Sequence, residues 1–151
     1  YNAVLTRDID LGGEAWTPIG QYARYAYTGN FDGQGYTISR LKVTGSSSNH
    51  YGLFGVVGNG GVIRSLTVSA VVTITGSGNG TYGIDGIIGK LDAGKIEQCI
   101  NEVVVSGNYN TGGTVGYLTN GGTVGQCINK ASITGSYRGA GQWRGRDQRL
   151  L

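Results

Sequence analysis

The sequence of 151 residues has no methionine, one proline, one histidine and few charged side chains. Only 14% of the residues are charged, against about 25% in a typical globular domain. No apolar run approaches the ~18 residues that a membrane-spanning helix needs, so we expect no membrane insertion. One histidine and two cysteines 28 residues apart do not form a zinc ligand set. We therefore expect neither a metal nor a cofactor.

The formal net charge is +3, but its distribution matters more than its size. Three cations, Arg144, Arg146 and Arg149, fall at the end of the chain. Without them the chain is nearly neutral, and we expect no nucleic-acid partner. The chain opens at Tyr1 with no charged segment followed by an apolar one. Two interpretations stay open: a signal has been removed, or the chain is a piece of a larger protein.

Glycine is abundant, with 30 residues, yet there is no collagen-like G-X-Y period and apolar residues are plentiful. The stretch GLFGVVGNGGVIRSLTV (52–68) places glycines between short clusters of Val, Ile and Leu. Glycine weakens strand interiors, so these glycines are expected at corners between short strands.

An internal repeat is the main signal in the chain. Its members begin with glycine and carry two apolar residues separated by two variable ones: GYTISRLKV (35–43), GVIRSLTV (61–68), GKIEQCIN (94–101) and GTVGQCIN (122–129). A G-x-x-G step lies upstream of the later units and a V-x-[TS]-G strand lies downstream. Three short strands per ~25–30 residues predict an all-β parallel solenoid. The alternative, a sandwich of hairpins, predicts no recurring three-strand unit.

In a solenoid, equivalent residues of successive coils stack ~4.8 Å apart. The repeat predicts one inward ladder of Leu41, Leu66, Cys99 and Cys127. It predicts a second ladder beside the first, formed by Ile38, Ile63, Ile96 and Val124.

Several spaced motifs resemble bacterial surface proteins with GLUG-type repeats. These are L-x-x-DIDL (5–11), W-x-PIG (16–20), FDG-x-G-x-TI (31–38), GLFG (52–55) and later G-G-x-V-G and C-x-N steps. The resemblance covers residues 1–141. It implies a right-handed parallel β-helix, pectin-lyase-like in shape, in secreted or cell-surface proteins, and the repeat units of this chain give it about four to five coils. It implies no catalytic motif in the repeat region.

We therefore expect a β-helix repeat domain over residues 1–141 and an irregular or disordered tail over 142–151. The tail, QWRGRDQRLL, lacks the next G-x-x-G strand. A second interpretation of the tail is that its natural continuation was lost. Five coils span only ~24 Å, and exposed coil ends invite pairing, so a homo-oligomer is a candidate assembly.

The segment WTPIGQYARYAYTGNF (16–31) concentrates aromatic residues. Trp16 and Tyr27 match positions that recur in the resembled family, which favours packing for both. Tyr22 and Tyr25 do not match such positions. They are the binding candidates, because exposed aromatic rings can stack on sugars.

Paired carboxylates at Asp8 and Asp10, with Asp32, could bind Ca²⁺ or act as acid and base. The preferred interpretation is a solvated strand edge, or carboxylates bonded to backbone groups, because Ca²⁺ usually takes 6–8 oxygen ligands. His50 is expected to be a surface or corner residue.

Cys99 and Cys127 share one ladder position, which is compatible with a disulfide, although buried thiols are preferred. Asn101 and Asn129 are expected to stack as a structural pair.

These features favour a non-catalytic stalk or adhesion segment at the cell surface or outside the cell, with glycans or host surface proteins as candidate partners. The alternative is a fragment of a carbohydrate-active β-helix enzyme, a polysaccharide lyase or glycoside hydrolase. An ice-binding solenoid ranks last, because Thr37, Thr67 and Thr75 do not sustain a regular row.

Overall fold

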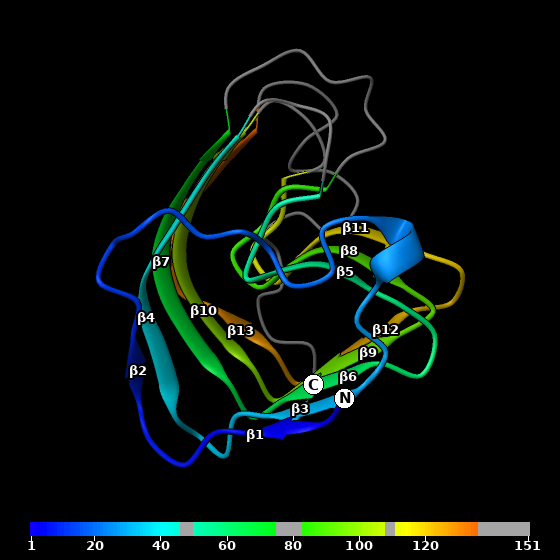
Figure 1. Ribbon diagram of the computed structural model, residues 1–151. Helices are drawn as coiled ribbons and strands as arrows, with labels where there is room; N and C mark the ends of the chain where they lie inside the picture. Colours follow the sequence, from blue (N-terminus) through cyan, green and yellow to red (C-terminus); the bar gives the residue numbers. More distant parts are fainter. Residues whose placement is uncertain (46–49, 75–82, 108–110, 136–151) are drawn as a thin grey trace.

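The computed structural model describes residues 1–45, 50–74, 83–107 and 111–135. Within them the chain is an all-β parallel solenoid of about four turns, as predicted. The expected tail at 142–151 lies outside these residues. Figure 1 shows three sheets around a common interior. They are named here in the order in which the chain visits them: sheet A, sheet B and sheet C.

Every strand pair in the three sheets is parallel, because each coil returns to the same sheet one layer further along. Sheet A contains β1 (Ala3–Val4), β3 (Asn30–Asp32), β6 (Val62–Arg64), β9 (Lys95–Glu97) and β12 (Thr123–Gly125). Sheet B contains β2 (Ile9–Asp10), β4 (Thr37–Gly45), β7 (Thr67–Ile74), β10 (Ile100–Gly107), β13 (Ile128–Asn129) and β14 (Ile133–Gly135). Sheet C contains β5 (Phe54–Val57), β8 (Ile88–Asp92) and β11 (Val115–Thr119).

The ladder of Leu66, Cys99 and Cys127 is confirmed by the register of the strands beside it. The ladder of Ile63, Ile96 and Val124 is confirmed as well. The prediction was wrong for the unit at 35–43. Phe31, not Ile38, pairs with Ile63 in sheet A, and Ile38 pairs with Val68 in sheet B.

The misplacement has a local cause at Arg40. A bulge between Ile38 and Leu41 puts Leu41 opposite Ala70, and Arg40 has a φ of 54°. Ser65 has a φ of 52° and also precedes an inward leucine, Leu66. The similar sequences ISRL (38–41) and IRSL (63–66) therefore share a local backbone geometry but lie at two different places in the coil.

The G-x-x-G steps are in register, because Phe54, Ile88 and Val115 pair across sheet C. Their glycines allow close packing across the interior. A Cβ on Gly86 would lie 2.3 Å from Asn101 Oδ1 and 2.5 Å from Val103 Cβ. Glycine is not used at three of the corners between sheets A and B. The residues with positive φ there, each directly before one residue of the ladder of Leu66, Cys99 and Cys127, are Ser65, Gln98 and Gln126.

The interior is filled by apolar ladders and by a small aromatic cluster. Phe54 is fully buried, with its ring centroid 5.2 Å from that of Tyr27 and 5.3 Å from that of Phe31. Tyr27 and Phe31 lie on one pass of the chain, and Phe54 lies on the next pass, stacked against it. The three rings fix the position of the long segment that precedes β3, which carries the two candidate tyrosines.

Replacement of Gly86 by alanine tests the close approach of sheets B and C. We expect Gly86→Ala to lower the free energy of unfolding by about 1–3 kcal/mol, because the new methyl group overpacks the interior. Gly125→Ala is the control, since a Cβ there meets its nearest neighbour only at 4.0 Å. Urea unfolding measures both; equal stability of the two variants would contradict the packing role of Gly86.

Candidate functional site

A 3₁₀ turn, η1 (Ala23–Tyr25), holds Tyr25, and Tyr22, the other tyrosine predicted as a binding residue, is the N-cap residue directly before it. Tyr22 is 46% exposed and Tyr25 is 64% exposed. The guanidinium carbon of Arg24 lies 4.9 Å from the centroid of the Tyr25 ring, which is a cation–π contact. Figure 1 shows η1 beside β5, β8 and β11 on the outside of the solenoid.

The segment that carries η1 is held on the solenoid at both of its ends. Ile19 forms a parallel bridge with Phe54, and Tyr27 forms one with Val57. The indole N–H of Trp16 donates to the carbonyl of Leu53 at 3.1 Å. Trp16 and Tyr27 pack against the core, as their sequence positions predict. The exposed tyrosines therefore project from a loop whose two ends are anchored.

A hollow of about 400 Å³ lies next to η1. Its lining includes Ala23 and Ala26 from the η1 segment, and Asn59, Asp92, Ala93 and Asn120 from three successive turns between sheets C and A. Ligand pockets occupy about 300–1,000 Å³, so the volume suits a small ligand. Sequence reasoning missed this site.

The length of the middle turn explains the hollow. Val57, Leu91 and Leu118 share one register position, and Val62, Lys95 and Thr123 share another. Four residues lie between these positions at 58–61 and at 119–122, but only three lie between them at 92–94, so the β8–β9 connection is one residue shorter than the other two. The shorter turn lies between two longer ones, and its residues therefore form a recess. The available sequence signal is NGG at 59–61 and 120–122, against DAG at 92–94.

Asp92 is the charged group of the hollow. Its Oδ1 accepts a hydrogen bond from Asn120 Nδ2 at 2.6 Å, and its Oδ2 lies 3.2 Å from Lys90 Nζ. The hydrogen bond from Asn120, followed by the contact with Lys90, lowers the pKa of Asp92 below its usual value despite partial burial. The carboxylate is therefore ionised at neutral pH and fixed in orientation.

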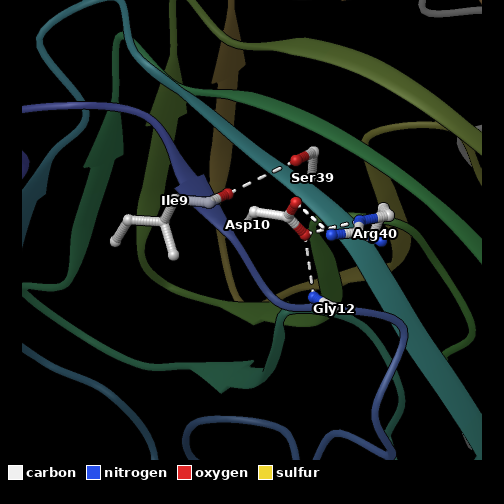
Figure 2. Close-up of polar contacts among 5 residues, drawn as sticks. All are labelled: Ile9, Asp10, Gly12, Ser39 and Arg40. Carbon is white, nitrogen blue, oxygen red and sulfur yellow. Dashed lines mark hydrogen bonds and ion pairs between the residues drawn. The ribbon is translucent and has the colours of Figure 1, made fainter.

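The three carboxylates considered as a calcium site have separate partners. Asp8 Oδ1 accepts from the Thr37 backbone N–H at 2.8 Å, and Asp32 contacts Arg64 Nη2 at 2.8 Å. Figure 2 shows Asp10 between the Gly12 backbone N–H, at 2.8 Å, and the Arg40 guanidinium. The hydrogen bonds from Arg40 and Gly12 lower the pKa of Asp10. Within the described ranges no group of three His, Cys, Asp or Glu side chains could hold a metal ion.

His50 lies at a corner of the solenoid, just before the bridge between Tyr51 and Ile84. Its Nδ1 accepts a hydrogen bond from the Gly83 backbone N–H at 2.9 Å. Burial lowers the pKa of His50 to about 4, and the positive charge of Lys90 acts in the same direction. The imidazole of His50 is therefore neutral in the folded protein at neutral pH, and its Nδ1 carries no proton and can accept the Gly83 hydrogen bond.

Cys99 and Cys127 are both fully buried and both present as thiols. Cys99 Sγ lies 3.3 Å from the Glu97 carbonyl oxygen, and Cys127 Sγ lies 3.4 Å from that of Gly125. Burial, with a further contribution from the neighbouring Cys127, raises the pKa of Cys99 well above its usual value. Low thiolate content and burial both oppose reactivity.

The two asparagines form the stacked pair that the sequence predicts. Asn101 Nδ2 donates to Asn129 Oδ1 at 2.8 Å, and Asn129 Nδ2 donates to the Ala131 carbonyl at 3.0 Å. Asn101 is fully buried. Their place is the interior face of sheet B, away from the exposed tyrosines.

The pKa of His50 makes stability depend on pH in a defined window. Between about pH 6.5 and 4 the unfolded chain binds a proton that the folded chain excludes, so stability falls as the pH falls. We expect a loss of about 2 kcal/mol between pH 7 and pH 5, measured by urea unfolding. His50→Asn offers an oxygen to the Gly83 N–H and should lose most of this dependence. The same pH slope in both proteins would contradict the assignment.

The state of the cysteines can be read by titration with Ellman's reagent. We expect negligible reaction in the native protein, because both thiols are buried, and reaction of both thiols after unfolding in guanidinium. Rapid labelling of the native protein would show that the coils do not shield Sγ. No labelling in guanidinium would reveal a disulfide.

Comparison with known proteins gives two distant relatives. No protein-family model matches the sequence, and no solved structure matches it. The chain is 37% identical over 75 residues to a Gly-rich membrane protein of Evansella cellulosilytica, covering 46% of this chain. It is 34% identical over 112 residues to a halomucin of Haloquadratum walsbyi, covering 74% of this chain.

The matched regions are small parts of both relatives. The chain spans 9% of the length of the first and 1% of the length of the second. In the part of the chain that the structure describes, there is no helix with the length and apolar character needed to cross a membrane. The similarity is therefore confined to a short region of each relative.

Proposed function

We propose that this chain is a non-catalytic β-helical segment of a secreted or cell-surface protein, of the GLUG-repeat type, which acts as a stalk and presents a glycan-binding surface at η1. The observation that carries the binding part is the exposed pair Tyr22 and Tyr25 on an anchored loop. Aromatic rings that are exposed and held in place can stack on the apolar faces of sugars.

The names of the two relatives support a location at the cell surface. One relative is named a Gly-rich membrane protein and the other a halomucin, and both names are compatible with proteins of the cell surface. The solenoid supports the stalk role, because each added coil extends the same three sheets by one strand spacing of about 4.8 Å. The in-register G-x-x-G steps support the GLUG-repeat resemblance.

The charge state of the carboxylates supports binding over catalysis. In glycosidases the general acid has a raised pKa, whereas the pKa values of Asp10 and Asp92 are lowered by their hydrogen-bonding partners. A carboxylate that stays ionised and is already paired is a hydrogen-bond acceptor for hydroxyl groups. It is poorly suited to protonate a glycosidic oxygen.

A glycan array tests the binding role. We expect the wild-type chain to bind a defined set of glycans and the Tyr22→Ala/Tyr25→Ala variant to bind them at least about tenfold more weakly, since about 1.4 kcal/mol corresponds to a factor of ten. Tyr1→Ala is the matched control, because Tyr1 is a fully exposed aromatic residue elsewhere on the chain. Silence across the array, or equal loss in the control, would contradict a glycan-binding surface at η1.

A further inference from the structure

We propose that the recess above the short β8–β9 turn binds a single neutral hexopyranose unit, with Asp92 and Asn120 hydrogen-bonded to neighbouring hydroxyl groups of the sugar. This inference rests on the proposed function and adds the class of sugar and the residues that recognise it. The geometry that carries it is a hollow of about 400 Å³ in which turns from three coils meet the η1 segment.

The shape of the recess follows from the lengths of the three connections around it. Asp92 ends β8 and Ala93 begins the short turn, whereas Asn59 and Asn120 belong to the longer turns on either side. The missing residue leaves room between two flanking turns that are fixed to the same sheets. A recess open to solvent can accept one residue of a longer glycan without enclosing the rest.

Several polar side chains line the recess. A carboxylate has about four acceptor positions, and Asn120 and Lys90 each engage Asp92. The amides of Asn59 and Asn120 add donors and acceptors, and Thr28 adds a hydroxyl. Adjacent sugar hydroxyls each need a donor and an acceptor, which a neighbouring carboxylate and amide supply together.

The amide of Asn120 and the carboxylate of Asp92 are held in place before any ligand binds. Asn120 has a φ of 51° and precedes Gly121, at 77°, so the turn presents its side chain in a fixed direction. The 2.6 Å bond to Asp92 then holds the amide and the carboxylate together. Groups oriented before binding lose less entropy when the ligand arrives.

The recess combines a charged group with apolar residues. Asp92 is ionised, because Asn120 and Lys90 lower its pKa, so its carboxylate repels that of an acidic sugar at close range, although its partner Lys90 offsets part of this repulsion. Ala23 and Ala26 are also among the lining residues and add apolar surface. A hexopyranose has the matching distribution, with hydroxyls at its edge and C–H groups on its faces.

The test is an NMR titration of the ¹⁵N-labelled chain with methyl glycosides of glucose, galactose and mannose, and with methyl glucuronide as the acidic comparison. We expect at least one neutral probe to shift the amide signals of Asn59, Asp92, Ala93 and Asn120, and methyl glucuronide to bind more weakly. Asn120→Gly should weaken the neutral probe at least tenfold, because glycine accepts the positive φ but lacks the amide. No shifts with any neutral probe, or shifts elsewhere, would overturn the proposal.

The controls separate this inference from the proposed function. Gln126→Gly removes an exposed amide at a φ of 52° on a different corner and should leave binding unchanged. If Asn120→Gly does not give a folded spectrum, the near-isosteric Asp92→Asn variant decides, and it too should weaken binding. Array binding that is lost in Tyr22→Ala/Tyr25→Ala but unchanged in Asn120→Gly would overturn the recess and leave the η1 surface intact.

Discussion

The in-register stacking of parallel strands is the constraint on which the rest of this structure depends. Phe31, Ile63, Ile96 and Val124 occupy one position in four successive strands, although the spacings between them in sequence differ. Each coil must return to the same three sheets, so extra residues are accommodated at bulges and turns. The pairing of the buried side chains is therefore the same in each coil, whereas the lengths of the turns on the surface differ.

The candidate site is a product of this division. Turns between sheets C and A vary by single residues, and each change moves side chains on the surface while the buried ladders keep their pairing. The recess at Asp92 arises from one residue fewer, between two turns that contain NGG. The η1 segment is a longer excursion at the level of sheet C, anchored through bridges from Ile19 and Tyr27 to the two ends of β5. Surface chemistry can thus change without a change in the core.

The fold was predictable from sequence because glycine steps and apolar positions recur with the coils, and G-x-x-G marks the same level of sheet C each time. The unit at 35–43 was assigned to the wrong sheet position, because the bulge at Arg40 and the corner at Ser65 have nearly the same positive φ and similar flanking residues. Tyr22 and Tyr25 could be singled out as aromatic residues outside the repeat pattern. Asp92 and Asn120 could not, because their proximity depends on the exact pairing of turns from two coils, 28 residues apart.

The buried pair Asn101 and Asn129 has a consequence for how the coils choose their partners during folding. Below Asn101 the same position is occupied by Val68 and then Ile38, so the column changes from apolar to amide partway along the solenoid. If a coil paired with the wrong neighbour, or slid along it, an amide would be buried against an aliphatic side chain without its hydrogen bond. Repeats that resemble one another are prone to such errors. The asparagine pair therefore favours the pairing of β10 with β13 over a displaced or exchanged pairing.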